Sequence, residues 1–559
     1  MDNKTLALLA LILLAALALR VYNLPNAGLR EGDETVYALE AQCFTQGPQP
    51  DCPECADYLN WRTPEECLPF GSFKPLFIVL AGGLTALTGD ALQSVLLLSA
   101  LAGALTVLLA FLLGREWGNE KIGLLAAALL AVCGMHLQYS RTGLTEVTQT
   151  LFLVLAVYLY ALAKRKGVDA RLLLFAAGIA AGACFETRYV GAIALPILFL
   201  LEAMHDWGKA KALRKFVYNT AIIAAGFLVV FAAFVLLYSA FGMDYGFYFV
   251  SRMGNAGITK TLVENIPFLR DVPHVDYAAG GGLEAATATA SFSQLSYSLF
   301  YYGYYFYRLN GPLIALLLVA GACFALVRRD KNDLRILAVL TALTAFYILA
   351  GFNHTRNLVA LAPFLAIPAA ALLLEARKNT KQIKKYSLGA FLAVVALASL
   401  AFVYPMLSFE WTAFQETGSA LAALNATGVI NNVPFQAYHP VPSKSIAGLN
   451  EETLAALPGE YTHLVITSEF IYNEPDYAEA FPSMALAYKI REKCPPTRII
   501  AVTPEYWRGF NDPLLLAALP FVRLVNPAAA DKIAYRTARP ADDIRIYSRY
   551  ECEAALTVG

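Results

Sequence analysis

Acidic side chains gather in a short stretch, LREGDETVYALE, that directly follows the first apolar segment of the chain. Asp33 and Glu34 stand side by side in it, and Tyr37 lies four residues after Asp33, on the same face of any helix that forms here. A carboxylate near a reacting hydroxyl can act as a general base. The stretch is therefore either a solvated loop or part of an active site at the membrane edge. The outlying carboxylates, Glu31 and Glu40, are expected to be solvated.

Further charged side chains flank other apolar segments that are far apart in the sequence. They are Lys74, Arg141, Glu146, Glu186, Arg188, His354 and Arg356. Lys and Arg side chains can hold a phosphate and stabilise it as it leaves, and ionisable residues near membrane segments are costly and usually functional. With the carboxylates, they predict transfer of a group from a phosphate carrier. The alternative is that the individual charges are solvated or pair with lipids.

The composition indicates a membrane protein that crosses the bilayer many times. Of the 559 residues, 58% are hydrophobic and 15% are charged, a charged share too low for a soluble protein of this length. The formal net charge is zero, so the total charge gives no sign of a nucleic-acid partner.

The apolar segments and the loop charges together predict a topology. A span needs about 20 apolar residues, and cytoplasmic loops carry an excess of Lys and Arg. With the N-terminus in the cytoplasm, the five inner loops hold 19 Lys and Arg, whereas the short outer loops around Arg141, Arg188 and Arg356 hold one each. This arrangement requires residues 75–88 to lie in the interface as a helix that does not span. The eleven expected spans are residues 4–22, 91–113, 122–138, 147–163, 172–185, 189–204, 216–240, 310–327, 334–351, 357–374 and 386–404.

The sequence predicts two domains. Residues 1–404 form a transmembrane domain with large outer loops at 23–90 and 241–309. Hydropathy falls after it, and residues 405–559 are expected to form an extracytoplasmic α/β domain. Its predicted strands include HLVIT (463–467), RIIAV (498–502) and IRIY (544–547).

The nine cysteines divide by position. Cys133, Cys184 and Cys323 fall in expected spans and are predicted to be buried. The other six fall outside: Cys43, Cys52, Cys55, Cys67, Cys494 and Cys552. An even number of outer cysteines favours disulfides in an oxidising compartment, with the pairing in the first loop left open. The weaker alternative for that loop is a zinc site.

The order of the motifs resembles that of a known enzyme family. GDE with a following tyrosine, KPLFIVLAGGLTALTGD, YSRTGLTE and HTRNLVALAPFLAIP occur in this order. The order is similar to that of the GT-C glycosyltransferases, in the superfamily of protein O-mannosyltransferases and lipid A aminoarabinose transferases. The resemblance covers roughly residues 5–375. This sequence departs from the family where Lys74 is followed by one proline instead of two, and where the second acid is Glu146 instead of Asp.

The resemblance implies a GT-C-like helical fold and roles for individual residues. Asp33 matches the catalytic base, with Glu34 beside it and Glu146 as the acid of the second outer loop. The donor-phosphate ligands it suggests are Tyr37, Lys74 and Arg356, and we add Arg188 to them from its predicted position. Further candidates are Arg141 and His354 and, from the loop 241–309, Arg308, Arg252 and Arg270, none of which is matched to a position of the family.

The resemblance also implies a reaction. A sugar passes from a polyprenyl-phosphate donor to a hydroxyl of a protein, lipid or glycan acceptor at the outer face, with inversion at the anomeric carbon. No cofactor is required for this, although a divalent metal could take part. The expected location is a prokaryotic plasma membrane. The rival interpretation is a transporter or flippase, but that class would place charges near mid-span, and here they gather at one rim.

Overall fold

The computed structural model describes most of the helical region and part of the C-terminal region. The described residues are 2–27, 32–46, 70–165, 170–206, 212–246, 292–349, 355–379, 390, 393–401, 413–431, 443–445, 449, 451–459, 461–467, 485–501, 523 and 543–557. Predictions for His354, Arg252, Arg270, Glu31 and part of the expected span 386–404 lie outside these ranges.

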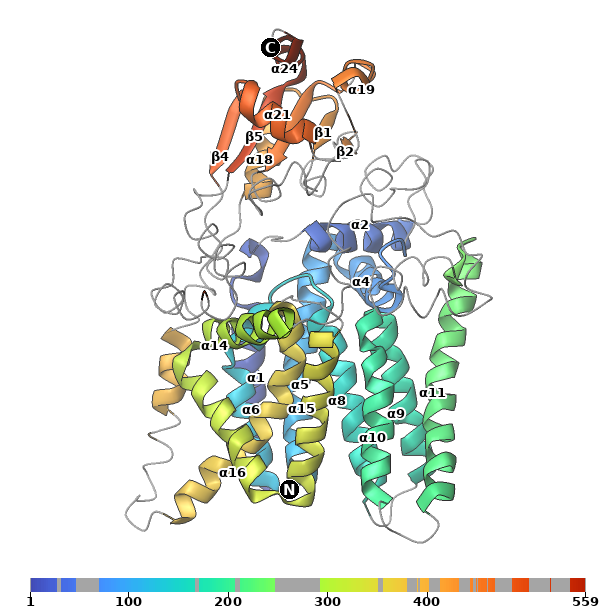
Figure 1. Ribbon diagram of the computed structural model, residues 1–559, viewed down its shortest axis with the longest axis vertical. Coiled ribbons are helices and arrows are strands. Elements are labelled where there is room, and N and C mark those ends of the chain that lie inside the picture. Colours follow the sequence, from blue (N-terminus) through green and yellow to red (C-terminus); the bar gives the residue numbers. More distant parts are fainter. Residues whose placement is uncertain are drawn as a thin grey trace.

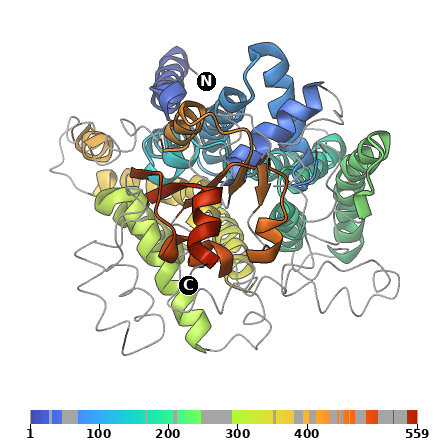
Figure 2. The same cartoon turned by 90° about the horizontal axis from the view of Figure 1, so that it is seen from above.

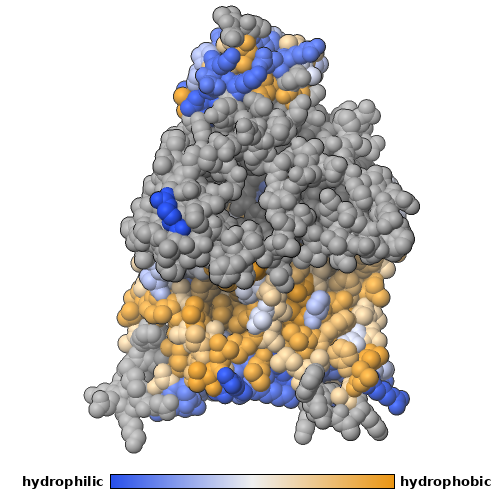
Figure 3. Space-filling model, in the orientation of Figure 1, coloured by the Kyte–Doolittle hydropathy of each residue, from blue (hydrophilic) through white to orange (hydrophobic). Residues whose placement is uncertain are grey.

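Long helices standing side by side form the lower part of the molecule (Figure 1). Their bounds are α1 (Asn3–Val21), α5 (Ala91–Trp117), α6 (Glu120–Ala131), α8 (Glu146–Ala163), α9 (Ala170–Thr187), α10 (Ala194–Asp206), α11 (Ala212–Ala240), α14 (Phe292–Arg328), α15 (Lys331–Leu349) and α16 (Ala362–Asn379). Hydrophobic surface covers this part, with a hydrophilic edge at its lower end (Figure 3). Within the described residues, seven helical segments are long and apolar enough to cross a membrane. The count of eleven spans stays a prediction.

Short helices cover one end of these long helices. They are η1 (Leu24–Asn26), α2 (Gly32–Gln46), α4 (Pro75–Thr88), α7 (Gly134–Tyr139), η2 (Tyr189–Ile193) and η6 (Thr355–Leu361). In Figure 1, α2 and α4 lie together at the upper end of the bundle. The apolar α4 has 14 residues, too few for a span, as the positive-inside argument predicted.

Two predictions about helix boundaries have different outcomes. The separation of 172–185 from 189–204 is confirmed, because α9 ends at Thr187 and η2 begins at Tyr189. The continuous span 122–138 is wrong, since α6 ends at Ala131 and α7 starts at Gly134. The side chain of Asn310 stabilises this break: its Oδ1 accepts from the Met135 N–H at 3.2 Å and lies 2.9 Å from Cys133 Sγ.

Glycines allow α9 and α11 to cross at close range. A Cβ atom added to Gly178 would lie 2.0 Å from the Ile223 carbonyl oxygen, and one added to Gly226 would lie 2.1 Å from the Phe175 carbonyl oxygen. Small residues permit this approach of two backbones in membrane proteins. The C-terminal end of α9, which carries Arg188 just beyond it, is therefore held at a fixed distance from α11.

Cys323 corrects another prediction from the sequence. Cys133 and Cys184 are buried as expected, but Cys323 is exposed on α14. Position within an apolar helix does not decide burial, because a helix at the edge of a bundle turns one face outward. α14 also bends at Gly311, where φ is +72° and Pro312 follows.

A five-stranded sheet lies in the C-terminal region. Figure 2, which looks down on it, shows the sheet over the middle of the helices. The strand order is β2-β1-β3-β5-β4, with parallel pairing of β1 with β2 and β3 and antiparallel pairing of β5 with β3 and β4. Three strands coincide with predicted ones. The bounds are β1 (Val429–Asn431), β2 (Ser443–Ser445), β3 (His463–Thr467), β4 (Arg498–Ala501) and β5 (Asp543–Ser548), with helices α18 (Ala413–Ala423), α19 (Glu451–Ala455), α21 (Ala485–Lys493) and α24 (Arg549–Thr557).

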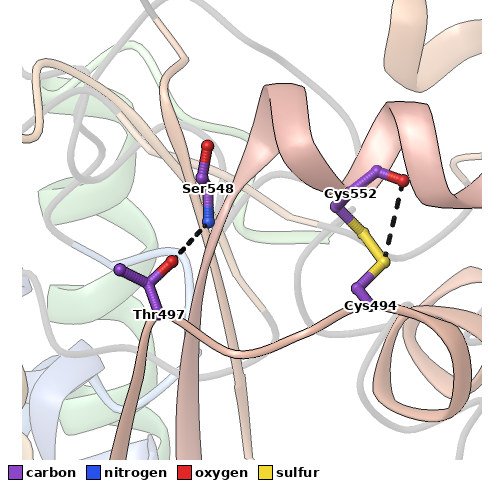
Figure 4. The surroundings of a disulfide bond; sticks show 4 residues. All are labelled: Cys494, Thr497, Ser548 and Cys552. Atoms are coloured by element: carbon purple, nitrogen blue, oxygen red, sulfur yellow. Dashed lines mark hydrogen bonds between the residues drawn. A yellow bond between two sulfur atoms is a disulfide. The ribbon is translucent and has the colours of Figure 1, made fainter.

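A disulfide joins two helices of this region. Cys494, which follows α21, bonds to Cys552 in α24 (Figure 4). Cys43 in α2 is also disulfide-bonded, while Cys52, Cys55 and Cys67 lie outside the described residues. Three of the six outer cysteines are thus in disulfides, as the sequence predicted for them.

The helix crossing gives a first testable prediction. Gly178→Ala places a methyl group against the α11 backbone, and overpacking of this kind costs about 1–3 kcal/mol. We expect a lower melting temperature of the purified protein in detergent. Gly83→Ala is the matched control, because a Cβ there has no neighbour within 4 Å. An equal melting temperature for both variants would contradict the tight crossing.

Candidate active site

One guanidinium lies between two carboxylates from distant parts of the chain. Arg356 is in the first turn of η6, and its Nη1 donates to Asp33 Oδ2 at 2.8 Å. Its Nε lies 3.2 Å from Glu146 Oε1. Asp33 belongs to the first turn of α2, and Glu146 is the first residue of α8. Both carboxylates are therefore at helix N-termini, where the helix dipole favours a negative charge.

A second guanidinium reaches the same carboxylate. Arg188 stands in the turn between α9 and η2, and its Nη1 lies 3.1 Å from Glu146 Oε1. The same nitrogen donates to Asn357 Oδ1 at 3.0 Å. We call Asp33, Glu146, Arg188 and Arg356 the charge cluster. The sequence placed all four on one side of the membrane, and the structure brings them into contact.

The charge cluster has an exposed part and a buried part. The side chain of Asp33 is 48% exposed and that of Arg356 is 17% exposed, whereas Glu146 and Arg188 are only 4% and 7% exposed. Removing one partner of a buried ion pair costs about 3–5 kcal/mol, while an exposed pair contributes about 0.2–1 kcal/mol. A ligand that arrives from outside can therefore reach Arg356 and Asp33 first.

Cations dominate the electrostatics of Asp33. Partial burial by itself raises the pKa of its carboxyl, but the neighbouring charges of Arg356, Lys74 and Arg188 outweigh this and hold the pKa below its ordinary value. Tyr37 is buried on the same helix, and burial, with the Asp33 charge, raises its pKa well above the ordinary value. Asp33 is thus the ionised group and Tyr37 the neutral one.

Lys74 is fixed at the start of α4. It occupies the N-cap position, directly before Pro75, and is buried. Its ammonium group lies over the Tyr189 ring, 4.8 Å from the ring centroid. The preceding Phe73 has a φ of +57°, an uncommon backbone conformation for a residue with a side chain. The structure therefore holds this cation close enough to lower the pKa of Asp33.

Glu34 contacts backbone and is fully buried. Its Oε1 accepts from the Gly143 N–H at 2.7 Å, which ties α2 to the segment between α7 and α8. That segment leads directly to Glu146. Glu34, which the resemblance placed beside the base, thus fixes the distance between the two helices that carry the acids.

The prediction that Glu40 is solvated is wrong. Glu40 is fully buried, and its two carboxylate oxygens accept from the N–H and the hydroxyl of Ser72, both at 2.5 Å. Hydrogen bonds to an ionised acceptor are stronger than neutral ones. Because Ser72 stands two residues before Lys74, Glu40 anchors the approach to that cation.

Arg141 and Arg308 have other surroundings. Arg141 is buried and donates to the carbonyl oxygens of Leu19, Arg20 and Tyr22 at the C-terminal end of α1. It therefore secures the helix that precedes α2. Arg308 lies in α14, half-buried and close to the bend.

Glu186 is buried and has a different partner from Arg188 of the same motif, ETRY. Its Oε1 accepts from the Tyr245 hydroxyl at 2.8 Å. Burial, with the Glu186 charge, raises the pKa of Tyr245. The Tyr245 ring also packs against Phe73 at a centroid distance of 5.2 Å. Of the two charged residues in ETRY, Glu186 therefore binds the segment that follows α11, whereas Arg188 belongs to the charge cluster.

Three neutral residues of the site went unpredicted. Asn357 holds Arg188, and the Tyr139 hydroxyl lies 2.6 Å from Thr355 Oγ1. Thr355, Arg356 and Asn357 are consecutive, yet they contact α7, the two acids and the α9–η2 turn respectively. These residues occur in the motifs HTRN and YSRTG. The sequence alone does not indicate which partner an uncharged side chain in a loop will bind.

The described part of the chain contains no group of three or more His, Cys, Asp or Glu side chains that could hold a metal ion. The carboxylates of Asp33 and Glu146 are already paired with guanidinium groups.

Parts of the sequence are similar to a known family and to a known enzyme. Residues 72–238 match the family described as dolichyl-phosphate-mannose-protein mannosyltransferase. The dolichyl-phosphooligosaccharide-protein glycotransferase 3 of Archaeoglobus fulgidus is 30% identical over 208 residues, a match that covers 33% of this chain and 23% of that relative.

Solved structures extend the similarity beyond this segment. The oligosaccharyltransferase AglB of Archaeoglobus fulgidus, with an inhibitory peptide and a dolichol-phosphate, has a TM-score of 0.56 at 15% identity, over 98% of this chain and 88% of that one. ArnT of Cupriavidus metallidurans, bound to undecaprenyl phosphate, has a TM-score of 0.53 at 14% identity, over 90% and 97%. The chain therefore has the fold of the GT-C glycosyltransferases, and its residues 72–238 match the mannosyltransferase family among them.

Proposed function

We propose that this protein transfers a sugar from a polyprenyl-phosphate donor to an acceptor hydroxyl at the outer membrane face. The observation that carries the proposal is the position of Arg356 against Asp33, with Lys74 near enough to act on the same carboxylate. A base and cations for a leaving phosphate thus share one place. The relatives with this fold include structures with a dolichol-phosphate and with undecaprenyl phosphate, which supports a lipid phosphate as the donor.

The proposed reaction is a single displacement. Asp33 takes the proton of the acceptor hydroxyl while the acceptor oxygen forms a bond to the anomeric carbon. The bond from that carbon to the phosphate oxygen breaks, and the polyprenyl phosphate leaves with the electron pair. Attack and departure on opposite faces invert the anomeric carbon. Arg356 and Lys74, with Arg188 behind them, stabilise the leaving phosphate.

The surroundings of the charge cluster support particular roles. Glu146 sets the position of the two guanidinium groups, and the neutral Tyr37 can donate a hydrogen bond near the phosphate. The step needs no cofactor, and a divalent metal would be an addition to cations that are already present. One solved oligosaccharyltransferase of Archaeoglobus fulgidus is described as a complex with zinc and sulfate, which makes metal dependence worth measuring.

The proposal includes a location and an arrangement in the membrane. We infer a prokaryotic plasma membrane, with the N-terminus in the cytoplasm and both the charge cluster and the C-terminal sheet outside. The disulfide between Cys494 and Cys552 supports an oxidising outer compartment. A lipid or glycan hydroxyl and a protein hydroxyl are both acceptors that the site chemistry accommodates.

The first experiment tests Asp33 as the base. Removal of a general base lowers the rate by about 10²–10⁴-fold, and we expect Asp33→Asn to lose transfer of radiolabelled sugar from synthetic polyprenyl-phosphate sugars. The matched control is Asp2→Asn, since Asp2 is an exposed N-cap at the other end of α1 and Asn caps equally well. Equal transfer by the Asp33 variant and wild type would remove Asp33 from the mechanism. Absence of transfer from any donor in wild type would favour the transporter.

The second experiment tests Arg356 as a phosphate ligand. A hydrogen bond to a charged group contributes about 1.5–3 kcal/mol, so we expect Arg356→Ala to raise the donor KM by about tenfold or more. Arg356→Lys should lie between wild type and the alanine variant, because an ammonium group cannot form a bidentate pair. Arg329→Ala, an exposed position far from the charge cluster, is the control. An unchanged KM in Arg356→Ala would contradict the assignment.

A further inference from the structure

The candidate base and the donor phosphate need the same guanidinium. Asp33 is paired with Arg356 at 2.8 Å, and a carboxylate in such a pair is a weak base because its charged form is stabilised. Arg356 is also the cation of the cluster that combines partial exposure with a direct contact to the base. While Arg356 is paired with Asp33, Asp33 is a weak base and Arg356 is not available to the phosphate. Both functions therefore require that Arg356 separates from Asp33.

The buried part of the charge cluster can stay in place during such a separation. Glu146 contacts Arg188 as well as Arg356, so it keeps one cation when the other turns away. Arg188 is held back from following Arg356, because the side-chain oxygen Oδ1 of Asn357 accepts from the Arg188 Nη1 at 3.0 Å. Asn357 is itself buried and stands next to Arg356 in η6.

We propose that the donor phosphate takes Arg356 from Asp33, and that Asn357 is a positioning residue that keeps Arg188 on Glu146 during this exchange. This inference rests on the proposed function. It describes how binding of the donor substrate makes the catalytic base Asp33 available. When the donor is bound, Asp33 is free to take the proton of the acceptor. When the site is empty, Asp33 remains ion-paired with Arg356. Water in the empty site then meets no free carboxylate base at this position.

Glu146 explains why a positioning residue is needed. It is buried, and its Oε2 has no hydrogen-bond partner among the described residues. A buried carboxylate that lost both cations would be strongly destabilised. If Arg188 were free to move to the phosphate, Arg356 would have to stay with Glu146, and the two guanidinium groups would compete for one place. The hydrogen bond from Arg188 to Asn357 removes this competition.

The exchange has a thermodynamic signature. The charged groups that act on Asp33 are Arg356, Lys74 and Arg188. The Asp33 charge in turn acts on Tyr37, and Glu146 shares Arg356 with Asp33. When Arg356 turns to a phosphate, the pKa of Asp33 rises from its depressed value toward or above the ordinary value of about 3.9. A pKa that rises on binding means that binding takes up a proton. Affinity for the lipid phosphate must then strengthen as the pH falls through the window between the two pKa values.

The direct test measures this proton uptake. The probe is a polyprenyl methyl phosphodiester, which carries one negative charge and does not titrate in the acid range. Calorimetry of the purified full-length protein in buffers of different ionisation enthalpy gives the number of protons bound. We expect uptake in wild type with a Kd that falls by up to about tenfold per pH unit in the window, and no uptake in Asp33→Asn. Binding without uptake, equal uptake in both proteins, or no binding of the probe would each overturn the exchange.

The kinetic test separates this inference from the proposed function. The acid limb of kcat/KM reports the free enzyme, and that of kcat reports the donor complex. We expect the limb of kcat to lie at higher pH in wild type. If transfer depends on Asp33 but the acid limbs of kcat and kcat/KM lie at the same pH, the proposed exchange is wrong and the proposed function is unaffected. A lack of transfer in wild type would count against the proposed function, while the calorimetric result would still decide the exchange.

Asn357→Ala tests the positioning role, with a matched control at the other end of the molecule. Asn332 accepts from Arg335 at 2.9 Å, so Asn332→Ala removes a comparable Asn–Arg contact far from the charge cluster. We expect Asn357→Ala to lower proton uptake, to bring the two acid limbs together and to raise donor KM more than it lowers kcat. Asn332→Ala should retain the wild-type uptake and limb separation. Both variants must elute as single species, and a correctly folded Asn357→Ala with unchanged uptake would overturn its role.

Discussion

Glu146 is a buried carboxylate, and the arrangement of the outer end of the protein depends on how its charge is compensated. A carboxylate in a poorly solvated place is stable only beside cations and hydrogen-bond donors. Its two cations come from the turn after α9 and from η6, more than 160 residues apart in the chain. The second of these cations also reaches Asp33 on α2. Four separate segments are thus brought together by one requirement for charge balance.

Other charged side chains around the cluster bind backbone groups and hold the segments of the charge cluster in place. Glu34 binds the segment that leads into α8, Glu40 binds the segment that leads into α4, and Arg141 binds the end of α1. Each of these side chains is buried, and the groups it binds here lie outside the charge cluster. Glu34 thus sets the position of α8, which carries Glu146, and Glu40 sets that of α4, which follows Lys74. Arg141 sets the position of the helix that precedes α2. The rim therefore contains two kinds of charge, those that face the substrate and those that hold the first kind in place.

The sequence predicts the first kind of charge better than the second. Asp33, Glu146 and Arg356 could be assigned to one surface because each flanks an apolar segment, and the alternation of spans decides the side of the membrane. The same argument could not tell that Glu40 is buried, because a carboxylate in a polar stretch looks the same in the sequence whether water or Ser72 donates to it. Asn357 is uncharged and belongs to no periodic pattern, so its contact with Arg188 could not be predicted from the sequence. The break after α6 was missed for a similar reason, since the partner that satisfies it is 175 residues away.

That partner, Asn310, has a mechanical consequence. It stands immediately before the bend of α14 at Gly311, and its amide oxygen satisfies the backbone at the start of α7. Its amide nitrogen donates to the carbonyl oxygen of Phe306, one turn earlier in α14. The interruption of one helix and the bend of another therefore form a single joint. A tilt of the upper part of α14 would either carry α7 with it or leave a buried amide hydrogen without an acceptor, so rigidity at this depth passes from one helix to the other through a single side chain.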